Sequence, residues 1–303
     1  MKAARIHAYG HSDQIQLEDI TIPSPSADEV LVRIAAAGVN PIDWKIREGY
    51  MPNARRLPFT LGQDFSGDVI ALGANVGTFS ESDDVYGFAD GAYAQYAVTS
   101  PSWIATKPRT VDDAIAATLP TPGLTAMQAV SELGRVEQPR DVLIHGAAGA
   151  VGSLATQLCI ARGMRVMATA SRKDFDYLEQ LGVARVIDYA RERFEDAVSG
   201  VGAVLDLVGG DTLARSFAVM ARGGTMVSTV GPLDPALAAK YGVRGIRMMM
   251  RKNSADLGEL AALVDRGVLV PHGLRTLPLD DARQAQELKQ AGTSSELLVL
   301  DAS

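Results

Sequence analysis

Apolar residues fall into short runs whose arrangement changes near residue 112. In the first third of the chain, runs such as 29–35, 66–72 and 92–98 are bounded by Gly, Pro, Asn and Asp. This pattern is typical of strands joined by turns. Many short strands with turn-rich connections predict a small barrel-like domain.

Beyond Asp112, strand and helix patterns alternate. The apolar run Asp141–His145 predicts a strand, and residues 151–162 predict a helix that ends at Gly163. Alternating strands and helices are typical of a parallel sheet with crossover helices. The remaining expected elements are strands at 165–170, 185–187, 203–208, 225–230 and 246–250 and a helix at 173–181.

The first pattern returns after Pro271, which predicts that one domain is inserted into another. The expected outer domain consists of residues 1–115 and 268–303, and residues 116–267 form the inserted, doubly wound α/β domain. A chain of 303 residues is long enough for each domain to bury its own core.

The composition is that of a globular protein, with 47% apolar and 21% charged residues. A net charge of −7 without a basic block argues against nucleic-acid binding. The single cysteine, Cys159, excludes a disulfide framework and a multi-cysteine zinc site, and the four histidines show no ligand spacing. No apolar run approaches a membrane span, and the start lacks a signal-peptide pattern, so a cytoplasmic protein that binds no membrane is expected.

A glycine-rich turn follows the expected strand Asp141–His145 directly. Gly146 allows a tight turn, while Gly149 and Gly152 allow close approach of backbone to a pyrophosphate and of helix to strand. The following helix presents free N–H groups and its positive end to the phosphate. The sequence therefore predicts a dinucleotide site, with a purely structural turn as the alternative. Its residues are Gly146, Ala147, Ala148, Gly149, Ala150, Val151 and Gly152.

The end of the next expected strand indicates which dinucleotide binds. An NAD site places an acid there, but this chain has Ala170-Ser171-Arg172-Lys173 and no carboxylate before Asp174. A hydroxyl followed by two cations suits a 2′-phosphate. The sequence predicts NADPH, held in part by Ser171 and Arg172. The alternative is that Arg172 and Lys173 merely begin a solvated helix.

The mid-chain turn and the β-rich domain before it resemble the medium-chain dehydrogenase/reductase superfamily. Five ordered segments are similar to motifs of its zinc-independent quinone oxidoreductase branch, which includes zeta-crystallin-like and alkenal/enone reductase-like proteins. The resemblance implies a GroES-like outer domain around a Rossmann domain. The segments are GVNPID at 38–43, LGQDFSG at 61–67, LPTPGLTA at 119–126, IDY at 187–189 and DLVGG at 206–210.

The zinc-binding members of this superfamily have a cysteine near position 39 and Gly-His-Glu where this chain has Gly62-Gln63-Asp64. No metal is therefore expected. Alcohol oxidation needs an alkoxide, which zinc or a positioned base supplies. Quinones and enones accept hydride directly, because the charge delocalises onto a carbonyl oxygen that the protein can stabilise. The resemblance implies NADPH-dependent reduction of quinones or α,β-unsaturated carbonyls.

The resemblance also implies catalytic residues. Lys45, in the segment Asp43-Trp44-Lys45, matches alkenal and enone reductases and is expected to bond the ribose or the substrate oxygen. Asp43 is expected to orient Lys45 or bond the ribose, and Asn40 to cap the following helix. Tyr50 is a candidate gate or proton donor. The alternatives are a solvated Lys45 and a packing role for Tyr50.

Further cofactor contacts are expected on the second half of the chain. The resemblance places Thr125 near the nicotinamide carboxamide and Tyr189 near the adenosine phosphate. Val208, Gly209 and Val230 close strands at the carboxyl edge of the sheet, where the cofactor is expected.

Two other functions remain open from the sequence: an enoyl-thioester reductase and a non-catalytic NADPH-binding protein. The first needs a basic entrance for a carrier phosphate, which the sequence does not identify. The resemblance also implies a homodimer formed through the edge of the cofactor sheet. Residues 241–252 follow no readable pattern.

Overall fold

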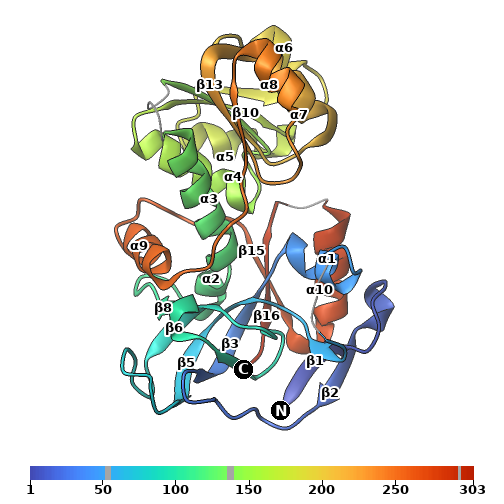
Figure 1. The fold of residues 1–303 in the computed structure, drawn as a ribbon, viewed down its shortest axis with the longest axis vertical. Helices are drawn as coiled ribbons and strands as arrows, with labels where there is room; N and C mark the ends of the chain where they lie inside the picture. The colour runs from blue at the N-terminus through green and yellow to red at the C-terminus, as the bar shows by residue number, and fades with distance from the viewer. Residues whose placement is uncertain (52–55, 135–139, 293–294) are drawn as a thin grey trace. The chain divides into compact units, whose positions relative to one another are not determined.

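The computed structural model describes residues 1–51, 56–134, 140–292 and 295–303 (Figure 1). The chain forms two compact units. The first contains residues 1–121, 252–267 and 272–303, and the second contains residues 122–251 and 268–271. Among the described residues, no helix is both long and apolar enough to span a membrane.

The first unit is built on two sheets. The larger has strand order β15-β16-β3-β5-β6-β8, with β7 also paired to β3, and the smaller has order β2-β1-β4. The pairings are antiparallel except between β15 and β16. Side chains such as Ile34, Phe65 and Leu300 fill a continuous core. The strands are β1 (Lys2–Ile6), β2 (Gln16–Asp19), β3 (Val30–Val39), β4 (Phe59–Thr60), β5 (Asp64–Leu72), β6 (Asp84–Phe88), β7 (Tyr96–Thr99), β8 (Ile104–Thr106), β15 (Leu274–Pro278) and β16 (Leu297–Asp301).

Two of the three strands predicted in this region are confirmed, and the third is shorter than predicted. The run 92–98 forms a strand only from Tyr96 onward. Tyr93 instead bonds to the backbone of Leu61 and Ala4, inside a connection between sheets. Its burial made the run look like one strand, but residues 93–95 bond partly to β1 and partly to Leu61, with only an isolated bridge between Ala3 and Ala94.

Among the residues that the structure describes, the α-helices of the first unit are α1 (Pro41–Arg47), α2 (Asp113–Ala117), α9 (Ser254–Asp265) and α10 (Ala282–Ala291). The sequence placed residues 254–265 with the inserted domain, whereas their contacts group α9 with the first unit. The Tyr86 hydroxyl donates to Leu257 O at 2.6 Å. Asp265 Oδ1 accepts the N–H groups of Arg109 and Thr110.

The second unit has a six-stranded parallel sheet of order β11-β10-β9-β12-β13-β14. In chain order this is 3-2-1-4-5-6, the doubly wound arrangement of the Rossmann fold. The predicted alternation and the parallel sheet are confirmed. The strands are β9 (Asp141–His145), β10 (Arg165–Ala170), β11 (Arg185–Asp188), β12 (Val201–Asp206), β13 (Met220–Ser228) and β14 (Arg244–Arg247). The helices are α3 (Pro120–Leu133), α4 (Ala150–Ala161), α5 (Phe175–Gln180), α6 (Phe194–Ala197), α7 (Gly210–Ser216) and α8 (Pro235–Tyr241).

Two titratable side chains in the second unit belong to its core. His145 is fully buried, and its ring nitrogens bond to Thr169 Oγ1 and Ser216 Oγ at 3.0 and 2.9 Å. Burial lowers the pKa of His145 to about 4. Burial also raises the pKa of the Cys159 thiol to about 12. Both groups are therefore neutral at pH 7, which fits structural roles.

Candidate functional site

The reversal of strand order falls between β9 and β12 in the second unit. In doubly wound sheets, ligands bind at the carboxyl edge at such a reversal, because the chains that leave the two strands turn in opposite directions. The turn after β9 begins at Gly146 and the turn after β12 contains Val208. A Cβ built on Gly146 lies 3.5 Å from Val208 Cγ2, so the two turns lie side by side.

The glycines of the first turn each meet a different geometric need. Gly146 has φ +74°, which favours glycine. A Cβ on Gly152 lies 2.1 Å from Gly146 O and 2.7 Å from Ala147 Cα, so only glycine lets α4 pack against the turn. A Cβ on Gly149 meets only Gly146 O, at 3.4 Å. The space beside Gly149 is therefore open for a ligand.

Gly149 is the N-cap of α4, a helix of 12 residues, and supplies no capping side chain. The first N–H groups of such a helix lack intrahelical partners and attract anions. Together with the open space at Gly149, these donors fit a pyrophosphate. Ala147 and Gly152 are buried, whereas Ala148, Ala150 and Val151 are partly exposed.

Asp206 holds the turn after β12 in place, a role that the sequence did not reveal. It is fully buried, and its Oδ1 accepts the N–H groups of Val208 and Gly209 at 3.2 and 2.9 Å. Its Oδ2 accepts the Ser228 hydroxyl at 2.8 Å, which ties the ends of β12 and β13 together. The sequence feature that could have indicated this role is the position of Asp206 as the first residue of the DLVGG motif.

The turns that Asp206 holds present apolar side chains to solvent. Val208 is 56% exposed and Val230 is 44% exposed. Gly209 has φ +81°, and a Cβ built on it would lie 3.2 Å from Val230 Cγ2, so the two residues pack together. Exposed valines at the carboxyl edge of a doubly wound sheet offer apolar contacts to a bound ring.

A second group of expected contacts lies where β10 ends. Ser171 is the N-cap of a short 3-10 turn (Arg172–Asp174). The Arg172 guanidinium carbon lies 4.7 Å from the centroid of the Phe175 ring. The Tyr189 N–H donates to Ala170 O at 3.4 Å, and its side chain is 67% exposed. Ser171, Arg172 and Tyr189 thus gather around one strand end. Thr125 is buried within α3.

In the first unit, α1 carries the expected catalytic residues. Asn40 is its N-cap, as predicted, and forms a capping box with Asp43. The Asn40 N–H donates to Asp43 Oδ2 at 2.8 Å. Asp43 is 1% exposed and also accepts the Tyr93 hydroxyl at 2.9 Å. Its carboxylate therefore bonds to protein groups in this unit.

Lys45 and Tyr50 both contact the ring of Trp44. Lys45 is half-buried, with its Nζ 5.6 Å from the centroid of the Trp44 ring. Tyr50 is 66% exposed and meets Trp44 edge-on at a centroid distance of 6.1 Å. Both side chains are accessible to a small molecule. Tyr50 thus packs against Trp44 with one edge while most of its side chain is exposed.

Asp64, part of the GQD segment, is a buried anchor. Its Oδ2 accepts the Asn40 side-chain amide and the Thr121 N–H, both at 2.8 Å, and its Oδ1 accepts the Thr121 hydroxyl at 2.6 Å. Complete burial, with a smaller contribution from the nearby Asp43 charge, raises the pKa of Asp64 to about 7 against the lowering effect of these hydrogen bonds.

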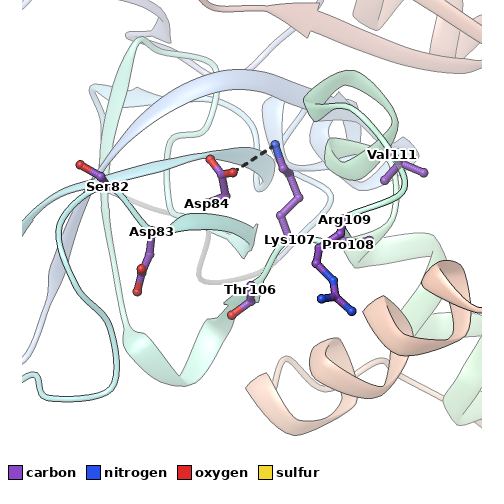
Figure 2. A pocket seen from close by; sticks show the side chains of 8 residues that line it. All are labelled: Ser82, Asp83, Asp84, Thr106, Lys107, Pro108, Arg109 and Val111. Carbon is purple, nitrogen blue, oxygen red and sulfur yellow. Dashed lines mark ion pairs between the residues drawn. The ribbon is translucent and has the colours of Figure 1, made fainter.

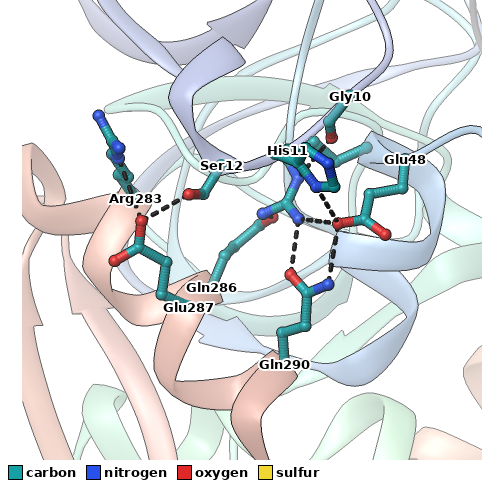
Figure 3. Close-up of polar contacts among 9 residues, drawn as sticks. Gly10, His11, Ser12, Glu48, Arg283, Gln286, Glu287 and Gln290 are labelled. Carbon is teal, nitrogen blue, oxygen red and sulfur yellow. Dashed lines mark hydrogen bonds and ion pairs between the residues drawn. The ribbon is translucent and has the colours of Figure 1, made fainter.

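Arg47 anchors the other end of α1, and Figure 3 labels its partners Gly10, Glu48, Gln286 and Gln290. It is fully buried, although most arginines are exposed. Its guanidinium donates to Gly10 O, Gln286 Oε1, Glu48 Oε1 and Gln290 Oε1 at 2.7 to 3.1 Å. These partners come from three separate segments, so no local pattern reveals the cluster. With Asn40 held at one end and Arg47 at the other, α1 is fixed within the first unit.

Comparison with known proteins identifies the family. Residues 26–109 match the family described as "Alcohol dehydrogenase GroES-like domain", and residues 181–295 match "Zinc-binding dehydrogenase". The quinone oxidoreductase structure from Coxiella burnetii is similar, with 34% identity, a TM-score of 0.94, and coverage of 100% of this chain and 99% of that chain. The chain belongs to the quinone oxidoreductase branch of the medium-chain dehydrogenase/reductase superfamily.

Two other relatives extend this result. A mycobacterial protein solved in complex with NADPH shares 30% identity and a TM-score of 0.90, over 99% of each chain. The 2-methylene-furan-3-one reductase of Solanum lycopersicum is 31% identical over 285 residues, which cover 89% of this chain and 71% of the relative. The chain is therefore an oxidoreductase of this family, with a nicotinamide cofactor and a small-molecule substrate. The predicted family, fold and enzyme class are confirmed.

The side chains of this protein do not fit the zinc ion that the matched family description names. Where the zinc-binding members of the superfamily have His-Glu, this chain has Gln63, an amide, and Asp64. The two oxygens of Asp64 already accept three hydrogen bonds. In the described part of the chain, no three His, Cys, Asp or Glu side chains are grouped to hold a metal. No step of the chemistry is therefore assigned to a metal.

A hollow of about 470 Å³ lies beside β6 and β8, and none of the expected site residues is among the residues that line it (Figure 2). Its cations are already paired with carboxylates. Lys107 lies 2.9 Å from Asp113 and 3.9 Å from Asp84. Arg109 Nε lies 3.7 Å from Asp265. This balance of charge gives the hollow no preference for an anionic or a cationic ligand.

Proposed function

We propose that this oxidoreductase uses NADPH to reduce quinones or α,β-unsaturated carbonyls without a metal. The observation that carries the proposal is the end of β10, where Ser171 and an accessible Arg172 stand in place of the acid of an NAD site. The relatives named for quinone and furanone reduction support the substrate class.

The bound nicotinamide would supply the hydride. The residues at 146–152 would hold the pyrophosphate, and Val208 and Val230 would make apolar contact with the nicotinamide end. Ser171 and Arg172 would bind the 2′-phosphate, with Tyr189 beside the adenosine. Thr125 would lie near the carboxamide, as expected from the family.

Lys45 would stabilise the substrate oxygen as negative charge develops on it. An ammonium is suited to this task because it donates a charge-assisted hydrogen bond without needing a metal. The fixed helix α1 keeps the lysine backbone in one place, which reduces the reorganisation needed during reaction. Tyr50, exposed beside Trp44, is the candidate to supply the proton or to gate access.

Replacing Lys45 with methionine is expected to lower kcat/KM for a short enone by about 10- to 100-fold, the range for loss of a charged hydrogen bond. The Kd for NADPH, measured by fluorescence titration, should change little, because methionine keeps the apolar stem. Lys240→Met on α8 is the matched control and should leave both quantities unchanged. An unaltered kcat/KM in Lys45→Met removes Lys45 from the reaction.

Replacing Arg172 with alanine is expected to remove cofactor discrimination. The wild-type protein should bind NADPH more than about tenfold tighter than NADH, because the guanidinium offers several donors to the 2′-phosphate. In Arg172→Ala, the two Kd values should become similar through weaker NADPH binding. Arg165→Ala, at the opposite end of β10, is the control. Equal affinities in the wild type would refute the NADPH assignment.

The substrate class is tested by NADPH oxidation with 1,4-benzoquinone, a short enone and crotonyl-CoA. Turnover of the quinone or the enone supports the proposal. A clear preference for crotonyl-CoA favours the enoyl-thioester alternative, and intact NADPH binding without any turnover favours a binding protein. We also propose a homodimer through the edge strand β14, which sedimentation velocity can test.

A further inference from the structure

Arg172 differs from three other arginines near it in sequence in what its guanidinium contacts. Arg165, Arg185 and Arg191 each pair with a carboxylate. The contact recorded for Arg172 among the described residues is instead the ring of Phe175, at 4.7 Å from ring centroid to guanidinium carbon. Its charge is thus held in position without being neutralised.

Phe175 is well placed to serve as a support. It is the C-cap of the 3-10 turn and the first residue of α5, so its backbone is fixed by two consecutive elements. Its side chain is partly exposed, so the ring is not fully committed to the core. Arginine stacks on an aromatic face through the plane of its guanidinium, which leaves the N–H groups at the edge free to donate.

We infer that Phe175 is a positioning residue that pre-orders Arg172 for a 2′-phosphate, which makes it a determinant of NADPH selectivity. This inference rests on the proposed use of NADPH. A free arginine must lose side-chain freedom on binding, whereas one already stacked on a ring loses less. The exposed Tyr189 lies at the same strand end, because its backbone N–H donates to Ala170 O.

The test measures binding of two small probes by calorimetry: adenosine 2′,5′-bisphosphate and ADP. Phe175→Leu should raise the Kd of the 2′-phosphorylated probe by about two- to fivefold, the range for loss of an exposed cation–π contact. The Kd of ADP should stay unchanged. Phe175→Tyr keeps the ring and should bind both probes as the wild type does. Lys240→Ala removes another cation–aromatic contact, with Tyr241, and should have no effect.

A double-mutant cycle tests whether Phe175 acts through Arg172. In the Arg172→Ala background, Phe175→Leu should have no further effect on the 2′-phosphorylated probe, because the ring acts only through the arginine. Equal weakening of both probes by Phe175→Leu, or unchanged binding of both, overturns the inference while leaving NADPH use intact. If Arg172→Ala itself leaves the preference for the 2′-phosphorylated probe unchanged, Arg172 does not bind the 2′-phosphate and the inference is overturned. Equal binding of the two probes by the wild type refutes the proposed cofactor instead.

Circular dichroism checks that Phe175→Leu is folded. If it is not, Phe175→Met replaces it, since methionine fills a similar volume without an aromatic face. The same two- to fivefold loss is expected for that variant. Full retention of the preference in a folded Phe175→Met overturns the inference.

Discussion

Replacing Gly152 with alanine is expected to raise the Kd for NADPH by at least about 100-fold. The added Cβ would lie 2.1 Å from Gly146 O and 2.7 Å from Ala147 Cα. Both are backbone atoms, so the turn or α4 must move to relieve the overlap. Overpacking of this kind also costs about 1–3 kcal/mol of stability, and the displaced donors no longer match a pyrophosphate.

Two other glycines give matched comparisons. A Cβ on Gly149 meets only Gly146 O at 3.4 Å, so Gly149→Ala should fold normally and weaken NADPH binding by occupying the ligand's space. A Cβ on Gly258, in α9, meets nothing within 4 Å, so Gly258→Ala should bind NADPH normally and be slightly more stable. Wild-type affinity in Gly152→Ala would show that residues 146–152 do not form the cofactor turn.

The second large effect concerns pH. The pKa of Asp64 is raised by burial from 3.8 to about 7, so between these values the folded state binds more protons than the unfolded state. The stability of the first unit should therefore fall as pH rises from about 4 to 7. Asp64→Asn removes this titration. The variant should gain stability relative to the wild type across that window, at up to ~1.4 kcal/mol per pH unit.

Tryptophan fluorescence is the suitable readout, because both tryptophans, Trp44 and Trp103, lie in the same unit as Asp64. Urea denaturation of the two proteins at several pH values gives the difference directly. His145 titrates in the opposite sense, since its lowered pKa of about 4 makes stability rise with pH. It is present in both proteins and cancels in the difference. Parallel pH profiles would contradict a protonatable Asp64.

Much of the second unit could be predicted from its sequence, because its signals are local. The central parallel strands, such as β9 and β12, are buried on both faces and form short apolar runs, and Gly163 and Gly182 end the helical segments. The turn at 146–152 could be predicted for the same reason. The backbone geometry that requires its three glycines lies within these seven residues.

The first unit was less predictable. The buried run at 92–98 forms a regular strand only from Tyr96, because residues 93–95 bond in turn to Leu61, β1 and β3 and follow no single ladder. Helix α9 follows the second unit in sequence but packs with the first, through Tyr86 and Asp265. A sequence pattern shows that a segment is buried, but it does not show against what.

The sequence by itself determined the family, the Rossmann topology and the turn that would bind a dinucleotide, because motif spacing and hydrophobic period are properties of neighbouring residues. Only the tertiary structure decided what holds the site together. Asp64 joins Asn40 to Thr121, Arg47 joins α1 to α10, and Asp206 joins the ends of two strands. These contacts link residues far apart in the chain, and buried polar groups must find such partners. Even Phe175, three residues from Arg172, became a support only once the fold placed its ring beneath the guanidinium.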